Sequence, residues 1–258
     1  SLKKTGGNII FGQKVNSLNF VEKKSWKVCA SSKLKKFDYY ADDVIYTPPP
    51  QSLLKHLEDS LDRNHIYKKR IQNLPQPSGA IVFYSALKKE HIKSISSNHY
   101  QFVSNDLGSL FVSISEDGDG RAPKGEITLI ASLFTKTSEW FTLGKYDYIE
   151  KKREYLQQIS IELENKFNID SVNWLHKELA TPLGFERWTN RPNGIVGGLG
   201  QSPDIFGLFG LSSRTPFQGL WLCGDSIYPG EGTAGVSQSA LMVSKQILVT
   251  KGIHNFNL

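Results

Sequence analysis

The sequence predicts a mixed α/β protein in which the two ends of the chain build one domain and the middle builds another. Short apolar strands of the kind found in parallel sheets occur near both ends, at 44–46 and 220–223. Between them lie β-rich runs typical of an antiparallel sheet, followed by a long amphipathic helix. We therefore expect residues 1–50 and 172–258 to form the first domain, and residues 51–171 to form a sheet-plus-helix insertion.

The first part of the chain alternates short strands with turns. Gly6-Gly7 fits a helix end, and the alternation of Ile9 and Phe11 predicts a strand after it. The prolines at 48–50 cannot donate to a β-ladder and should stop the strand at 44–46. A helix should follow, with Leu53, Leu54 and Leu57 on one face. The strands expected in this part cover 9–11, 15–18, 26–28 and 44–46.

The middle and the end of the chain give clearer patterns. A polar stretch rich in glycine and aspartate, residues 116–126, predicts a long turn between two strands. A short strand or strand pair should begin near 172, before a loop rich in glycine, proline and aromatic residues. The expected strands are 78–87, 109–117, 126–135 and 220–223, and the expected helices are 146–167 and about 237–250.

Composition excludes several function classes. The 258 residues carry a formal net charge of +6 in small dispersed clusters, which favours a solvated surface over a nucleic-acid-binding patch but permits contact with anionic lipid. The two cysteines lie far apart and the histidines lack metal-ligand spacing, so we expect neither a disulfide scaffold nor a metal site. No apolar run approaches the roughly 18 residues of a membrane span.

The segment "LWLCGDSIYPGEGTAGVSQSALMVSKQIL", residues 220–248, carries the strongest chemical signal. Asp225 follows a buried strand, where ligands of open α/β sheets bind, and its carboxylate can accept hydrogen bonds from a ribose or ribitol hydroxyl. Glycines beyond it let backbone N–H groups approach a ligand. A helix starting near Gly235-Val236 would direct its positive end at a phosphate or at the N1/O2 edge of a reduced flavin. A plain strand–turn–helix with a glycine-rich turn is the alternative.

The same segment resembles the C-terminal FAD-binding segment of the phytoene desaturase and carotenoid isomerase group, within the amine-oxidase-like flavoproteins. The resemblance extends in order over most of the chain and points to the cyanobacterial branch of carotenoid 3',4'-desaturase-like proteins. It implies the C-terminal part of an FAD/NAD(P)-binding fold with an inserted substrate domain. The other matching stretches are "GGNIIFGQKVNSL", "ADDVIYTPPPQSLLKHL", "LPQPSGAIVFYSAL" and "ATPLGFERWTNRPNGIVGGLGQ".

The resemblance implies roles for residues at matching positions. Asp225 would bind the ribityl or pyrophosphate part of FAD, residues 232–236 would lie against the isoalloxazine ring, and the backbone of Val15 would contact the adenine. The β-rich middle would form an apolar tunnel for a polyene. The implied cofactor-binding set is Val15, Gly224, Asp225, Gly230, Gly232, Thr233, Ala234, Gly235 and Val236.

Residues for catalysis are less clearly marked, because the cofactor of such an enzyme carries the difficult step. Glu186 and Arg187 lie among aromatic residues and could line the ring or the tunnel mouth; a plain ion pair that anchors the loop is the alternative. Glu231, within the glycine loop, could act as a base or stabilise a cationic polyene. A solvated loop carboxylate explains it equally well.

The sequence departs from the family pattern in one unit, the one that binds the ADP half of FAD. The family opens with a strand, a GxGxxG turn and a helix that bind the ADP half of FAD, and this chain has no such unit; "GIVGGLG" is better read as a loop near the substrate or flavin. We expect a C-terminal portion whose partner is the missing N-terminal half of the same protein. The implied activity is FAD-dependent carotenoid desaturation on the cytoplasmic side of a membrane, with peripheral attachment. Carotenoid cis–trans isomerisation, a non-enzymatic module like the Rab dissociation inhibitors, and an inactive fragment are the alternatives.

Overall fold

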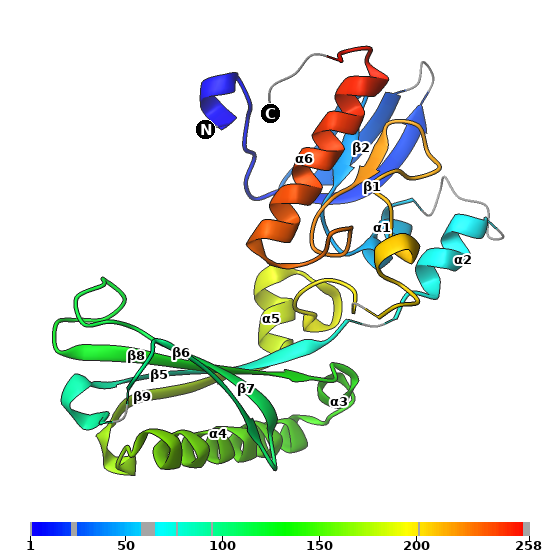
Figure 1. Cartoon of the computed structure of the whole chain (residues 1–258). Helices are drawn as coiled ribbons and strands as arrows, with labels where there is room; N and C mark the ends of the chain where they lie inside the picture. Colours follow the sequence, from blue (N-terminus) through cyan, green and yellow to red (C-terminus); the bar gives the residue numbers. More distant parts are fainter. Residues whose placement is uncertain are drawn as a thin grey trace. The chain divides into compact units, whose positions relative to one another are not determined.

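The computed structural model describes residues 2–21, 25–57, 65–75, 77–93, 95–200 and 202–254, apart from the side chain of Leu208. The chain forms two compact units (Figure 1). The first unit comprises Ser1–Gln76 and Gly197–Leu258, and the second comprises Pro77–Val196. Each is described by itself.

The first unit contains a three-stranded antiparallel sheet in the order β1-β2-β3. Leu18 and Trp26 are buried beneath it, and the indole N–H of Trp26 donates to the carbonyl of Gln218 at 2.8 Å. This bond ties the N-terminal sheet to the last part of the chain. The strands are β1 (Lys14–Val21), β2 (Ser25–Ser31) and β3 (Lys36–Ala41).

A second, two-stranded parallel sheet joins the two ends of the chain. β4 (Val44–Tyr46) pairs with β10 (Leu220–Leu222), which confirms that apolar strands at both ends share one sheet. The predicted helix after the prolines also forms, as α1 (Pro50–His56), with Leu53 buried and Leu54 partly buried in the same apolar cluster. The unit's other helices are η1 (Leu2–Thr5), α2 (Ile66–Gln72), η6 (Gly207–Phe209) and α6 (Gly232–Thr250).

The second unit is a five-stranded antiparallel sheet in the order β6-β7-β8-β5-β9, with α4 along one face (Figure 1). Its core lies between the sheet and α4, where Phe83, Trp140 and Phe167 are fully buried. The strands are β5 (Gly79–Lys88), β6 (His99–Ser104), β7 (Gly108–Ile114), β8 (Glu126–Thr135) and β9 (Trp174–Ala180). The helices are η3 (Lys89–His91), α3 (Ser138–Phe141), α4 (Lys145–Phe167), η4 (Ser171–Asn173), α5 (Pro182–Thr189) and η5 (Pro192–Gly194).

The two units divide at other positions than the predicted domain boundaries at 50/51 and 171/172. α1 stays with the first unit because Leu53 and Leu57 pack in its core. β9 stays with the second unit because it completes the sheet at the edge of β5. The assignment of the units to cofactor and substrate remains a prediction.

Three local predictions are wrong. Residues 9–11 form no strand, because none of the described strands pairs with them. The side chains of Ile9 and Phe11 are exposed. The expected loop after β9 begins with α5, where Pro182 occupies the first turn, a position in which its missing N–H costs nothing. α6 begins at Gly232, earlier than the predicted start near 235–237, because Gly232 with its φ of +84° turns the chain directly into the helix.

Candidate functional site

The corner after β10 is fixed by backbone bonds on both sides. The N–H of Cys223 donates to the Tyr46 carbonyl at 3.1 Å, which extends the parallel ladder by one residue. Gly224 then turns with a φ of +123°, and its N–H donates to Oγ of Ser239 at 3.2 Å. Since Ser239 is fully buried on α6, this bond holds the strand end against the helix. Asp225 is thereby placed at the carboxyl end of the parallel pair, as the sequence predicts.

Asp225 itself is half-buried, with its carboxylate next to a hydroxyl. Oγ of Ser226 donates to Oδ1 of Asp225 at 3.3 Å. The next residue, Ile227, is buried and bonds back through its N–H to the Gly224 carbonyl at 3.2 Å. The turn is therefore rigid on its inner side, and a carboxylate on such a turn is suited to accept hydroxyl donors of a ligand.

The start of α6 is open to solvent. Glu231 occupies the N-cap position, but its side chain makes no capping bond to the helix, and residues 232–234 are exposed. The first N–H groups of α6 are thus available to an electron-rich ligand, and the helix dipole adds a partial positive charge there. The sequence prediction of an anion-suited helix end fits this geometry.

Two glycines of the corner, Gly232 and Gly235, are required for different structural reasons. Gly232 has a φ of +84° and open space where a Cβ would lie, so its backbone angle demands glycine while leaving room beside it. A Cβ on Gly235 would lie 2.4 Å from the carbonyl oxygen of Gly230. Gly235 is therefore explained by close packing of the chain against itself. A ligand is not needed to account for it.

The "GGLG" loop lies against this corner. A Cβ on Gly198 would meet the carbonyl oxygen of Asp225 at 2.0 Å, so the two backbones are in direct contact. The N–H of Gly198 also donates to Oε2 of Glu231 at 3.2 Å. Glu231 thus braces the loop, and its role as a base stays a prediction.

Val15 reaches the same end of the parallel sheet through a chain of hydrogen bonds. Its carbonyl lies 3.2 Å from Nε2 of His56, whose Nδ1 lies 2.9 Å from the Tyr46 hydroxyl. Because a carbonyl only accepts, Nε2 carries the proton, and in the neutral ring Nδ1 accepts from Tyr46. Burial raises the pKa of Tyr46 well above its ordinary value, so the phenol keeps its proton. The predicted contact between Val15 and an adenine is left open by this geometry.

Glu186 and Arg187 lie on α5, in the second unit. Oε1 of Glu186 accepts from the backbone N–H of Asn193 at 3.0 Å, which anchors the following turn. The guanidinium of Arg187 lies 5.5 Å from the ring centre of the exposed Trp188. Within the described residues no ion pair joins Glu186 to Arg187, so the loop is anchored through the backbone instead of the predicted pair.

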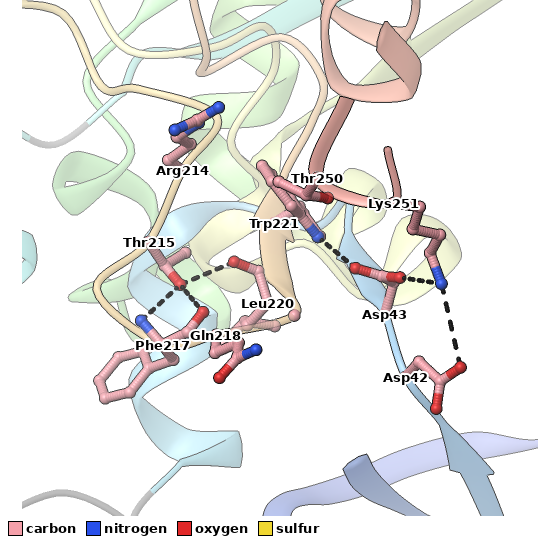
Figure 2. Close-up of a pocket in the computed structure, with 11 residues that line it drawn as sticks. Asp42, Asp43, Arg214, Thr215, Phe217, Gln218, Leu220, Trp221, Thr250 and Lys251 are labelled. Atoms are coloured by element: carbon pink, nitrogen blue, oxygen red, sulfur yellow. Dashed lines mark hydrogen bonds and ion pairs between the residues drawn. The ribbon is translucent and has the colours of Figure 1, made fainter. Parts of the chain in front are cut away.

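A pocket of about 310 Å³ lies at the opposite end of β10 and α6 (Figure 2). Trp221 donates from Nε1 to Oδ1 of Asp43 at 2.8 Å, and Nζ of Lys251 lies 2.9 Å from Oδ2 of the same carboxylate. The hydrogen bond and charge of Asp43 raise the pKa of Lys251. Figure 2 shows this group on one wall of the pocket and Arg214 on the other.

Sequence reasoning missed this pocket. Asp42 and Asp43 are visible before the strand, but nothing in the sequence pairs them with Lys251 at the far end of the chain. The group fixes the C-terminal end of α6 to the start of the parallel sheet. A structural role therefore accounts for it, and none of the predicted site residues lies there.

The part of the chain that the structure describes contains no cluster of His, Cys, Asp or Glu side chains that could hold a metal ion. None of the described helices combines the length and the apolar character needed to cross a bilayer.

No family model matches the chain. A prolycopene isomerase of Daucus carota is 30% identical over 149 residues, which is 57% of this chain and 24% of that protein. A prolycopene isomerase 1 of an Oncidium hybrid cultivar is 33% identical over 153 residues, 57% of this chain and 25% of that protein. The chain is similar in sequence to carotenoid isomerases. This similarity confirms the resemblance to the phytoene desaturase and carotenoid isomerase group that the sequence predicts. The chain spans about a quarter of the length of the curated relatives it matches.

Solved structures confirm the fold class. An oxidoreductase from Methanosarcina mazei aligns with a TM-score of 0.61 at 17% identity, covering 94% of this chain and 51% of that one. Aklavinone-11 hydroxylase, solved with FAD and aklavinone, aligns with a TM-score of 0.51 at 12% identity, covering 97% of this chain and 39% of that one. The chain thus has a mixed α/β fold that is similar to part of each of these two proteins.

Proposed function

We propose that the chain forms the flavin-contacting C-terminal part of an FAD-dependent enzyme that acts on a carotenoid. One observation carries this proposal: the start of α6 is exposed and lacks a side-chain cap, beside a half-buried Asp225 at the carboxyl end of a parallel strand. The similarity to prolycopene isomerases supports the carotenoid, and the likeness to FAD-dependent folds supports the cofactor.

Each residue of the corner has a task in this proposal. Asp225 accepts hydrogen bonds from ribityl hydroxyls, and the open N–H groups at the start of α6 stabilise negative charge on the ring edge. Bound FAD would supply the redox chemistry. Gly232 leaves room for the ring, while Gly235 and Gly198 keep the corner rigid through backbone contact.

We propose that a preceding segment of the same protein holds the ADP half of the cofactor. We propose that it packs on α6, whose described sequence carries one charged residue, Lys245, yet buries only Ser239 and Val243. Leu241 and Val249 remain 41% and 44% exposed. An apolar helix of this length normally has a packed partner on such a face.

The carotenoid would lie on the face of the five-stranded sheet that α4 leaves uncovered. Alternation along the strands directs Tyr84, Ile130 and Phe134 to this face, and Tyr84 pairs directly with Ile130. Phe111 of β7 lies opposite Ser132 on the same face. The charged residues on this face, the Lys88–Glu126 pair at the strand ends and Glu178 on the edge strand β9, leave apolar and small side chains between them, which suit a polyene that offers no polar group to bind.

Two reactions fit this site. In desaturation, bound oxidised FAD would accept the two hydrogens that the polyene loses, whereas cis–trans isomerisation on the same scaffold leaves the composition of the polyene unchanged. The names of the curated relatives favour isomerisation, and the oxidoreductase fold favours desaturation. A non-enzymatic binding module has no need for an open helix start beside a carboxylate.

The test uses the chain extended by its preceding coding sequence, purified with FAD and incubated anaerobically with prolycopene in detergent. A product lighter by two hydrogens identifies a desaturase. A product of unchanged mass with a shifted absorption spectrum identifies an isomerase. Unchanged prolycopene with a fully flavin-loaded protein would contradict the carotenoid part of the proposal.

A further inference from the structure

We propose that one end of the β1-β2-β3 sheet is a docking surface for an anionic lipid bilayer. We call this surface the hairpin end and define it as residues 9–14 and 32–36. The proposal goes beyond the proposed catalytic function, since it concerns residues remote in sequence from Asp225 and requires neither flavin nor carotenoid.

Strand register brings the two segments to one end of the sheet. Lys14 of β1 pairs with Ser31 of β2, and Ser31 pairs with Lys36 of β3. The chain before Lys14 and the turn between β2 and β3 therefore emerge at the same edge. The hydroxyl of Tyr39 donates to Oε1 of Gln13 at 2.8 Å, which holds the entering segment to β3.

The turn at 32–35 is closed tightly and projects one leucine. The N–H of Ser32 donates to the Lys35 carbonyl at 2.8 Å, and the N–H of Lys35 donates to Oγ of Ser32 at 3.2 Å. Leu34 at the tip is 92% exposed, and Phe11 in the neighbouring segment is 85% exposed. Since the turn is ordered by its own bonds, Leu34 is held outward instead of folding back onto the sheet.

Further apolar side chains widen this surface. Ile9 and Ile10 are 52% and 55% exposed. Together with Phe11 they put three large exposed apolar side chains in one short segment, 9–11, which is a mark of an interaction site. Exposed apolar side chains of this kind suit insertion into the boundary between headgroups and acyl chains.

The charge around these side chains has one sign. Lys14, Lys33, Lys35 and Lys36 all lie within the hairpin end, and residues 1–21 and 25–37 contain no aspartate or glutamate. The next acid, Asp38, is already paired with Lys27 at 2.8 Å. The lysines therefore attract an anionic surface without internal compensation.

This combination selects a bilayer over other partners. A second copy of the chain would bring the same lysines together and be repelled. Lysines around a projecting leucine can keep their ammonium groups among lipid phosphates while the apolar tip enters the membrane.

The test measures sedimentation of the chain with phosphatidylcholine vesicles that contain phosphatidylserine, compared with pure phosphatidylcholine vesicles. We expect binding to the anionic vesicles that weakens at high salt, and at least about tenfold weaker binding to the neutral vesicles. The double variant Leu34→Ser/Phe11→Ser should bind the anionic vesicles about tenfold more weakly. The variant Lys33→Glu/Lys35→Glu should lose binding to them altogether.

Matched controls come from the second unit. Val172→Ser removes an apolar side chain that is 80% exposed, and Lys145→Glu reverses an exposed charge; both should bind vesicles like the unmodified chain. Unfolding midpoints equal to that of the unmodified chain establish that the hairpin variants fold. Absence of vesicle binding, or equal binding by all variants, would overturn the proposal. A self-association that Leu34→Ser/Phe11→Ser abolishes, without vesicle binding, would identify a second copy as the occupant instead.

Discussion

The backbone of Gly198 lies directly against that of Asp225, so that a Cβ at residue 198 would come within 2.0 Å of the Asp225 carbonyl oxygen. The same glycine donates its N–H to Glu231 on the other side of the corner. The loop before residue 200 is therefore the wall behind the carboxylate. Gly198, Asp225 and Glu231 therefore act as one rigid unit.

Replacement of Gly198 should disturb this wall. Gly198→Ala forces two backbones apart, and we expect a loss of about 1–3 kcal/mol in the free energy of unfolding, measured with urea. Gly200→Ala, in the same loop, is the matched control because its Cβ would meet no atom within 4 Å. Equal stability of the two variants would show that the contact with Asp225 is loose.

Helical glycines in the two units should respond in opposite directions. Gly235→Ala on α6 places a Cβ against the Gly230 carbonyl, so the free energy of unfolding should fall by about 1–3 kcal/mol. Gly184→Ala on α5 meets open space and should raise it by about 0.5–1 kcal/mol, because alanine loses less backbone entropy. Thermal and urea unfolding of both variants provide the comparison. A stabilised Gly235→Ala would refute the packing explanation for that glycine.

The group at the far end of α6 should depend on Asp43 far more than on Asp42. Asp43→Ala removes a carboxylate that holds both Trp221 and Lys251, and we expect a loss of about 2 kcal/mol in the free energy of unfolding. Asp42→Ala removes only a solvent-exposed contact of 3.9 Å and should change little. If urea unfolding gives similar losses for both, the indole hydrogen bond contributes less than the geometry indicates.

The turn between β7 and β8 should have a distinct acid response. Hydrogen bonds from Arg121, followed by that from the Glu116 backbone, lower the pKa of Asp119 from 3.8 to about 2. Because the folded value lies below the unfolded one, the contribution of Asp119 is complete above pH 3.8 and is lost as the pH falls toward 2. Carbon-detected NMR titration of the Asp119 carboxyl should give this midpoint. Arg121→Ala keeps the backbone bond but should shift the midpoint part of the way back toward 3.8, and an unmoved midpoint would exclude the Arg121 side chain as the main cause.

Much of the fold follows from local patterns in the sequence. The strand at 126–135 and the helix ending at Phe167 form where the apolar spacing predicts them, since these elements bury one continuous stripe against a single core. The sequence does not predict β3 and β6, because exposed polar residues along these strands obscure the alternation of apolar and polar side chains. Whether such strands form depends on the strands they pair with in the folded chain. β6 lies at a sheet edge, and β3 is held by its pairing with β2.

The candidate site was foreseen only in part. The position of Asp225 at a strand end follows from an apolar run that stops at a glycine. The packing reason for Gly235, the brace from Glu231 and the link from Val15 through His56 all depend on tertiary contacts. Sequence periodicity contains no information about such contacts, so residue types alone could not separate glycines that admit a ligand from those that admit a neighbouring carbonyl.

Flavin retention is the most direct measure of the central proposal, that the Asp225 corner and the start of α6 hold an FAD. The chain, extended by its preceding coding sequence, is passed through gel filtration, and its absorbance at about 450 nm is compared with that at 280 nm. Asp225→Ala should lose most of the flavin, because ribityl hydroxyls lose their acceptor, whereas Asp204→Ala, an exposed carboxylate of the same unit, should keep it. Full yellow colour in Asp225→Ala would contradict the account.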